Sequence, residues 1–188
     1  MLQNNERLME VIAEMSKEYD VNNPVRLDKK LVHKAEEQNI LVSDIKRVPD
    51  SEGDHFVAML CIDLKHPFFF EHPKDHVPGL MFIEGGRQVG TAMAHMFYDV
   101  PFNMAFVLSE MNVRFYKFAD INRPVFVSSI LRNKVFRKGK LTQMEHEGVF
   151  IQGGDELAFL GGSWHMFDEK IIERMRRSKT HDVVSLEQ

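Results

Sequence analysis

The sequence predicts an α+β fold in which a curved antiparallel sheet wraps around one long central helix. The first observation is a mostly apolar stretch of helical length, residues 79–98, in the middle of the chain. The second is the run of four segments rich in Val, Ile, Phe and Thr that follows it, which is typical of strands. The third is that the last two breaks between these segments, Lys138-Gly139 and Gly153-Gly154-Asp155, are short enough to be hairpin turns. Hairpins make neighbouring strands antiparallel.

The chain before the central helix is predicted to form one helix and two strands. The helix covers residues 4–19, whose apolar residues recur at helical spacing: Leu8, Val11, Ile12 and Met15. Residues 21–29 contain Asn-Asn-Pro and predict a connecting loop. Residues 40–48 alternate weakly and residues 55–64 are almost continuously apolar, as expected of a strand that is covered on both faces.

After the central helix the hydrophobic pattern changes from a helical period to that of strands. We expect four strands, at residues 104–118, 125–137, 141–152 and 156–167. A charged segment, residues 168–177, then predicts a final helix.

The composition is that of one ordinary globular domain, with 188 residues, 44% hydrophobic and 28% charged residues, and a formal net charge of −4. We expect an N-terminal helix and loop at residues 1–29, a single domain at residues 30–178 and a polar tail at residues 179–188. The negative net charge argues against a nucleic-acid-binding protein, since such a domain is expected to be basic. The one cysteine, Cys61, lies in an apolar run, which excludes a disulfide framework and predicts a buried, unreactive thiol.

Two features bear on targeting and membranes. The first twenty residues are acidic and lack the charged-then-apolar pattern of a signal peptide, so we expect a cytoplasmic protein. The central apolar stretch is a poor candidate for a membrane span because polar residues interrupt it: Glu84, Arg87, Gln88 and His95. We therefore expect neither a membrane nor a nucleic-acid partner.

The central helix carries a polar stripe. Glu84, Gln88, Thr91 and His95 fall at positions i, i+4, i+7 and i+11 and share one helix face, with Arg87 beside them. A helix enclosed by a sheet is expected to have such a stripe only where it faces a cavity or a partner subunit, because a buried carboxylate without a partner costs about 3–5 kcal/mol. The alternative is that Glu84 and Arg87 simply neutralise each other at a subunit contact.

The loop before this helix, HPFFFEHPKDHVPG, ends in Pro78-Gly79. The first backbone N–H groups of a helix have no internal acceptor, so the helix start at Gly79 suits a developing oxyanion such as a polarised thioester carbonyl. His72 and His76 lie six and two residues before Pro78 and titrate near neutrality. A metal site formed by His66, His72 and His76 fits no standard spacing, so we expect no metal and no cofactor.

This central segment resembles the signature of the AfsA family, the A-factor (γ-butyrolactone) biosynthesis hot-dog proteins. The matching positions are Asp75-His76, Pro78-Gly79, Glu84, Arg87-Gln88 and His95. Flanking segments are similar too: Leu31-Val32-His33-Lys34, Ile40-Leu41-Val42-Ser43, Val100-Pro101 and residues 172–176. The resemblance covers most of the chain from about residue 30 and implies the hot-dog fold, which is the sheet and helix arrangement predicted above.

The resemblance also implies an activity. It indicates an acyltransferase that moves a β-ketoacyl group from an acyl carrier protein (ACP) or CoA thioester to a C3 phosphate such as dihydroxyacetone phosphate, in butyrolactone-like signal or secondary-metabolite biosynthesis. Glu84 would take the proton of the attacking hydroxyl, Gly79 would polarise the thioester carbonyl, and His76 would help to bind the substrate. Arg87 would hold either the phosphate or Glu84, and Gln88 would orient the acyl group.

A more distant resemblance, to β-hydroxyacyl-ACP dehydratases, leaves alternatives open. It matches His72 to the catalytic histidine and Glu84 to the catalytic acid, so dehydration and thioester hydrolysis are the alternative reactions. A non-catalytic acyl-binding module is a third interpretation, since fold does not imply activity. AfsA-family members usually carry two hot-dog modules in tandem, whereas 188 residues hold one. We therefore expect a homodimer with composite sites.

Overall fold

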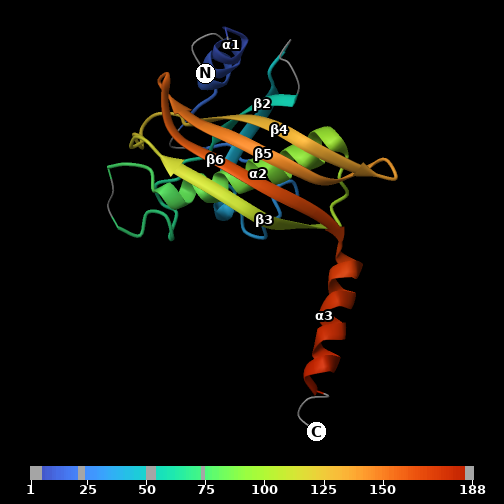
Figure 1. The fold of residues 1–188 in the computed structure, drawn as a ribbon. Helices are drawn as coiled ribbons and strands as arrows, with labels where there is room; N and C mark the ends of the chain where they lie inside the picture. Colours follow the sequence, from blue (N-terminus) through green and yellow to red (C-terminus); the bar gives the residue numbers. More distant parts are fainter. Residues whose placement is uncertain (1–5, 21–23, 50–53, 73–74, 185–188) are drawn as a thin grey trace.

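A computed structural model describes residues 6–20, 24–49, 54–72 and 75–184 (Figure 1). In chain order the elements are α1 (Glu6–Ser16), the short 3-10 helix η1 (Glu37–Asn39), β1 (Val42–Arg47), β2 (Asp54–Leu60), α2 (Gly79–Tyr98), β3 (Met104–Phe115), β4 (Phe126–Arg137), β5 (Lys140–Gln152), β6 (Asp155–Asp168) and α3 (Glu169–Val184). Apart from η1, this order is the predicted one.

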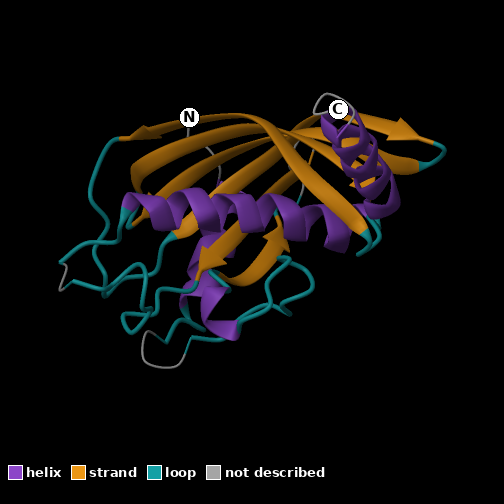
Figure 2. Ribbon diagram, turned by 90° about the horizontal axis from the view of Figure 1, so that it is seen from below, coloured by secondary structure: helices purple, strands orange, loops and turns teal. Residues whose placement is uncertain are grey.

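The six strands form one antiparallel sheet in the order β1-β2-β4-β5-β6-β3. The sheet is curved, and Figure 2 shows its strands arching over α2. This is the hot-dog fold, so the predicted α+β architecture is confirmed. The sheet leaves β1 and β3 as its two edge strands.

The central helix has the bounds that the sequence predicts. Pro78 precedes Gly79 with a φ of −63° and extended backbone, and proline has no N–H that a further helical turn could use. At the other end Asp99 adopts the left-handed conformation, with a φ of 51°, and its N–H donates to Ala94 O. Among the described residues, no helix combines the length and the apolar character needed to cross a membrane.

Both predicted hairpins are present. Arg137 pairs with Lys140, and Gln152 pairs with Asp155, so each turn has two central residues. All four central residues have positive φ angles: Lys138 52°, Gly139 75°, Gly153 60° and Gly154 90°. This is the conformation of type I′ turns, whose twist matches that of the strands they join.

The helix α1 packs on the face of the sheet that points away from α2. Its four predicted apolar residues are all buried there, against side chains of β2, β4 and β5: Val57, Met59, Phe126 and Ile151. The alternate residues of β2 belong to the main core around α2, so β2 is covered on both faces as its continuous apolar run predicts. Cys61, just beyond β2, is buried and free, and burial raises the pKa of its thiol to about 11.

Two elements, β2 and α3, differ most from the predicted ends, while α1 and β3 each end three residues early, at Ser16 and Phe115. The predicted strand over residues 55–64 stops at Leu60, because Asp63 starts a turn: its carbonyl oxygen accepts the His66 N–H and its carboxylate accepts the Lys65 N–H. The final helix continues to Val184, past the predicted end at residue 177. Figure 1 shows that α3 points away from the sheet. The predicted polar tail is therefore helical up to Val184, and its last four residues lie outside the described part of the chain.

Glycines bring α2 close to the sheet. A Cβ at Gly86 would lie 2.8 Å from Leu160 Cδ1 and 3.4 Å from Phe150 Cζ, and both of these side chains are fully buried. A Cβ at Gly85 would lie 3.0 Å from Leu60 Cδ2. Each glycine in a helix interior costs roughly 1 kcal/mol relative to alanine. Close packing of the helix against the sheet explains why this cost is tolerated.

Replacement of Gly86 by Val is expected to lower the free energy of unfolding by about 2 kcal/mol, because its methyl groups would force the buried Leu160 out of place. Urea unfolding measures the effect. Leu80→Val is the matched control, since Leu80 is exposed on the same helix and its replacement should change stability by less than about 0.5 kcal/mol. A Gly86→Val protein as stable as the wild type would contradict this account of the packing.

Candidate active site

The polar stripe of α2 is covered by a loop of the same chain, residues 29–41. Lys34 Nζ lies 2.7 Å from Glu84 Oε1. Arg87 Nη2 donates to Val32 O over 3.3 Å. The sequence predicts that this stripe faces a cavity or a partner subunit along its length. Instead, the chain's own loop supplies most of its contacts, and the stripe borders a cavity at its Glu84 end.

Glu84 is held by four contacts. Arg87 binds it in two places, Nε to Oε2 at 2.9 Å and Nη2 to Oε1 at 2.8 Å. Gln88 Nε2 donates to Oε1 over 2.9 Å, and Lys34 forms the ion pair described above. Burial by itself raises the pKa of this carboxyl, but the bonds and charge of Arg87, with Gln88 and Lys34, outweigh burial and lower the pKa to about 2. Glu84 is therefore an ionised carboxylate.

Gln88 is fully buried and positions Glu84. Its Oε1 accepts the Leu41 N–H at 2.8 Å, and its Nε2 donates to Asn39 O at 2.8 Å as well as to Glu84. These three bonds use both amide N–H groups and one lone pair of the oxygen. A direct contact between a substrate and the N–H groups of Gln88 would require one of these bonds to break.

A cavity of about 410 Å³ lies beside Glu84. Its lining comes from the 29–41 loop, the loop before α2 and the first turns of α2: Lys34, Asn39, His66, Phe68, Phe69, Leu80, Ile83 and Glu84. Part of the lining is therefore apolar, and part of it is the Lys34–Glu84 ion pair. This combination is typical of a site for a ligand that has an apolar part and a polar reacting group.

His66 also lines this cavity, although the sequence suggests no role for it beyond an improbable metal site. Its ring is buried, and its Nδ1 accepts the backbone N–H groups of Phe68 and Phe69, each over 3.2 Å. Its Nε2 must then carry the proton, which it donates to Asn39 Oδ1 at 3.2 Å. Burial lowers the pKa of His66, so the ring is neutral and holds the loop and Asn39 in place.

The other predicted residues lie outside this cavity. His72 is exposed in the loop before α2. His76 and Gly79 line a second cavity, of about 280 Å³, together with Phe82 and four residues at and after the end of β3, Phe115, Tyr116, Lys117 and Phe118. The His76 ring pairs with Asp75 Oδ1 at 2.7 Å and lies 4.7 Å from the Phe118 ring. The helix start and the Glu84 carboxylate thus serve different cavities of the same chain.

A histidine pair anchors the covering loop at the far end of the stripe. His33 Nε2 and His95 Nε2 are 2.9 Å apart, and His95 Nδ1 donates to Val100 O at 2.6 Å. Because Nδ1 of His95 carries its proton, its Nε2 accepts the proton of His33. Burial lowers the pKa of both histidines, which keeps the pair neutral. His33 has a φ of 53°, a strained conformation for a non-glycine residue that these contacts maintain.

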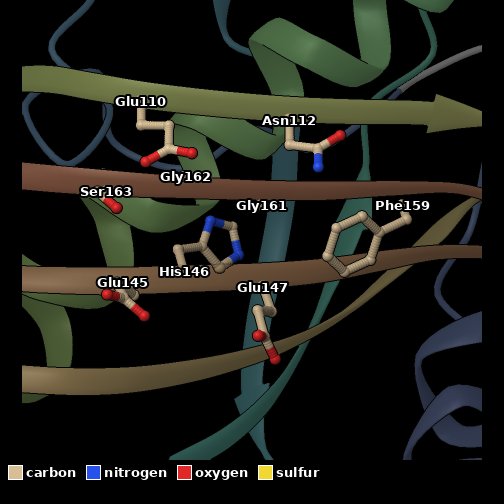
Figure 3. A pocket seen from close by; sticks show the side chains of 9 residues that line it. All are labelled: Glu110, Asn112, Glu145, His146, Glu147, Phe159, Gly161, Gly162 and Ser163. Carbon is tan, nitrogen blue, oxygen red and sulfur yellow. The ribbon is translucent and has the colours of Figure 1, made fainter.

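A third hollow, of about 260 Å³, lies on the opposite face of the sheet, over β3, β5 and β6 (Figure 3). Glu145 and Glu147 line it, while His146 between them in β5 turns toward α2. These carboxylates already have partners, because Arg132 Nε binds Glu147 at 2.7 Å and Asn133 Nδ2 binds Glu145 at 2.6 Å. In the described part of the chain, no group of three or more His, Cys, Asp or Glu side chains could hold a metal ion.

Comparisons with known proteins bear on the family and the fold of this chain. The family model AfsA, the A-factor biosynthesis hotdog domain, matches residues 15–168. A 2-oxo-3-(phosphooxy)propyl 3-oxoalkanoate synthase from Streptomyces griseus is 29% identical over 80 residues, which are 43% of this chain and 24% of the relative. The synthase of the same name from Streptomyces coelicolor is 32% identical over 73 residues, 39% of this chain and 21% of that protein. The matches thus span less than a quarter of the length of these relatives.

Among solved structures, a chain of the dehydratase heterocomplex ApeI:P from Xenorhabdus doucetiae is similar to this one with a TM-score of 0.59. The sequence identity is 15%, and the similarity covers 81% of this chain and 98% of that chain. At 15% identity this similarity shows the fold alone.

Proposed function

Because the chain belongs to the AfsA family of A-factor biosynthesis hotdog domains, we propose that it is an enzyme that acts on acyl thioesters of ACP or CoA. The reaction is transfer of a β-ketoacyl group to a hydroxyl of a C3 phosphate such as dihydroxyacetone phosphate. The name of the Streptomyces griseus relative describes an ester of this kind. The product would enter butyrolactone-like signal or secondary-metabolite biosynthesis.

The observation that carries this proposal is the position of Glu84 at the wall of an apolar cavity. The apolar lining suits an acyl chain: Phe68, Phe69, Leu80 and Ile83. We expect the reacting end of such a chain to meet the Glu84 carboxylate, which lines the same cavity. Arg87 and Gln88 hold this carboxylate in one orientation, which general acid–base catalysis requires.

In the proposed reaction the acceptor hydroxyl attacks the carbonyl carbon of the thioester. The C–O bond forms, the C–S bond breaks, and the hydroxyl proton passes to Glu84 and then to the leaving thiolate. A carboxylate positioned for such a proton transfer contributes about 10²- to 10⁴-fold to the rate. Gln88 acts here by orienting Glu84, and Arg87 by binding it.

We propose further that the active form is a homodimer. The second cavity, at Gly79, is bordered by large aromatic side chains that face solvent, and Phe118 is 82% exposed. Exposed apolar clusters of this kind mark interaction surfaces. The neighbouring β3 is an edge strand, whose free N–H and C=O groups can pair with another chain. In a dimer, Gly79 and the exposed His72 would serve a site shared with the second copy.

The Phe118→Asp variant is expected to weaken the dimer by about 100-fold or more, because it places a charge in the apolar contact. Light scattering at micromolar concentration measures the change in mass. Phe136→Asp is the matched control, since Phe136 is similarly solvent-facing, with 51% exposed, but lies at the far end of β4. A wild-type protein that is a clean monomer at this concentration would refute the homodimer.

Intact mass spectrometry of the carrier tests the reaction. The protein is incubated with β-ketoacyl-ACP or β-hydroxyacyl-ACP, with and without dihydroxyacetone phosphate. Loss of the acyl group that depends on the phosphate supports transfer, and loss without it supports hydrolysis. Loss of water from the β-hydroxyacyl carrier supports dehydration. Binding with an unchanged mass in every mixture would leave a non-catalytic acyl-binding module and reject the enzymatic proposal.

A further inference from the structure

Glu84, the one carboxylate among the described residues that line this cavity, has two cationic partners. Lys34 and Arg87 both contact this one carboxylate, and within the described residues it is the one carboxylate paired with either of them. Arg87 alone satisfies Glu84 as a bidentate partner, with one bond to each oxygen. Lys34 is therefore a surplus cation at the end of an apolar cavity.

Lys34 is able to change partners without movement of the loop that carries it. Before Lys34 the loop is fixed by the His33–His95 bond and by Arg87 Nη2, which donates to Val32 O. After Lys34 it is fixed by Gln88, which bonds Asn39 O and the Leu41 N–H. The ammonium group sits on a flexible four-carbon stem and has three donors. The side chain is about a quarter exposed, so it reaches the cavity and solvent alike.

Asn39 offers a second donor in the same cavity. The Nδ1 atom of His66 accepts two backbone N–H groups, so the ring proton is on Nε2. Asn39 Oδ1 accepts this proton. The Nδ2 group of Asn39 is then left as the donor on the side chain that lines the cavity. Lys34 and Asn39 together provide a cation and a neutral N–H donor, a combination that suits a phosphate oxygen.

We propose that Lys34 binds the phosphate of the acceptor, and that this exchange of partners releases Glu84 to act as the base. This inference rests on the proposed acyl transfer. With no C3 phosphate bound, Lys34 and Arg87 both neutralise Glu84. The carboxylate is then too weak a base to take a proton from an attacking water molecule. When the phosphate takes Lys34 away, Glu84 keeps its partial burial and loses one cation, so its affinity for a proton increases. The acyl thioester is thereby protected from hydrolysis until the acceptor arrives.

Calorimetric binding tests the phosphate site without any need for turnover. The wild type is titrated with dihydroxyacetone phosphate and with unphosphorylated dihydroxyacetone. We expect the phosphate compound to bind at least about tenfold more tightly, and Lys34→Met to remove this preference. Lys34→Arg should keep most of it, and Lys30→Met, which removes an exposed charge from the same loop, should behave as the wild type. Equal binding of both compounds by the wild type, or an unchanged preference in Lys34→Met, would overturn the proposal.

The rate of thioester loss without acceptor tests the release of Glu84. We expect Lys34→Met to hydrolyse β-ketoacyl-ACP about tenfold faster than the wild type, since Glu84 has lost one cation permanently. A merely structural role for Lys34 would lower this rate instead, and that result would reject the gating step. If the wild type binds the phosphate through Lys34 yet consumes no thioester in any mixture, the phosphate site stands and the proposed transfer reaction fails.

Discussion

The Glu84→Gln variant should transfer acyl groups about 10³-fold more slowly than the wild type, because glutamine keeps the shape of the side chain but cannot accept a proton. Its amide oxygen can still accept a bond from Arg87, so the fold should persist. We expect a loss of about 1–2 kcal/mol in stability, because Lys34 and Arg87 lose their carboxylate at a site that is partly open to solvent. Single-turnover kinetics with acyl-ACP and the C3 phosphate measure the rate.

The matched control for this variant is Glu110→Gln. Glu110 lines the hollow on the opposite face of the sheet, away from α2 (Figure 3), and carries the same substitution. Its rate should stay within about twofold of the wild type, as expected of a surface change away from the site. A Glu84→Gln protein that is as active as the Glu110→Gln control would mean that the candidate site is wrong.

Stability should fall by about 3 kcal/mol between pH 6.5 and pH 4 through His146 alone. This side chain is fully buried in β5, and its Nε2 bonds Ser129 Oγ at 3.1 Å. Burial lowers the pKa of His146 from 6.5 to about 4. Between pH 6.5 and about pH 4 the unfolded chain therefore binds a proton at His146 and the folded chain does not. The contribution of His146 to folding stability is thus fully present above pH 6.5 and is lost as the pH falls.

The measurement is a set of urea unfolding curves from pH 7.5 to pH 4.5 for the wild type and the His146→Gln variant. Other buried histidines also contribute to the wild-type slope, so the difference between the two proteins is the quantity of interest. That difference should shrink steadily as the pH falls. His165→Gln, in the neighbouring β6, is the control and should keep the wild-type slope. A difference that stays constant over the whole range would show that His146 does not titrate as described.

The secondary structure could be predicted because short-range patterns determine it. The helix α2 has a proline at its entry and an aspartate in the left-handed conformation after its last turn, and both act on their immediate neighbours. The two type I′ turns depend on two residues each. Where the prediction missed, as at the end of β2, the cause was a side chain that bonds the backbone two residues away, at Asp63.

The surroundings of the polar stripe could not be predicted in the same way. The bonds that cover it join residues 47 positions apart, in Leu41 and Gln88, and 62 positions apart, in His33 and His95. The loop that makes them has no regular period, so its place over α2 leaves no trace in the hydrophobic pattern. For the same reason Lys34 and His66, which share the cavity with Glu84, had no assigned role in catalysis before the fold was known.

The roles of His72 and Gly79 in the reaction stay predictions. In one chain neither lines the cavity at Glu84. In the proposed homodimer their contribution would depend on a second copy of the chain, and a sequence pattern does not specify the geometry of an interface. The residues that could be placed, Glu84, Arg87 and Gln88, are those whose relative positions follow from the helix itself.

The Leu41 N–H donates to the buried Gln88 side chain, so the hydrogen-exchange rate of this amide measures the stability of the loop over the candidate site. This amide is held by a side chain of α2, so it becomes open to solvent when the loop lifts from the helix, even while the sheet stays intact. Its exchange rate therefore reports the free energy of the local loop opening, whereas the exchange rates of amides within the strands report the free energy of global unfolding. A ligand that closes the loop over α2 would slow exchange at Leu41 first, and the degree of protection would give its affinity without any catalytic assay.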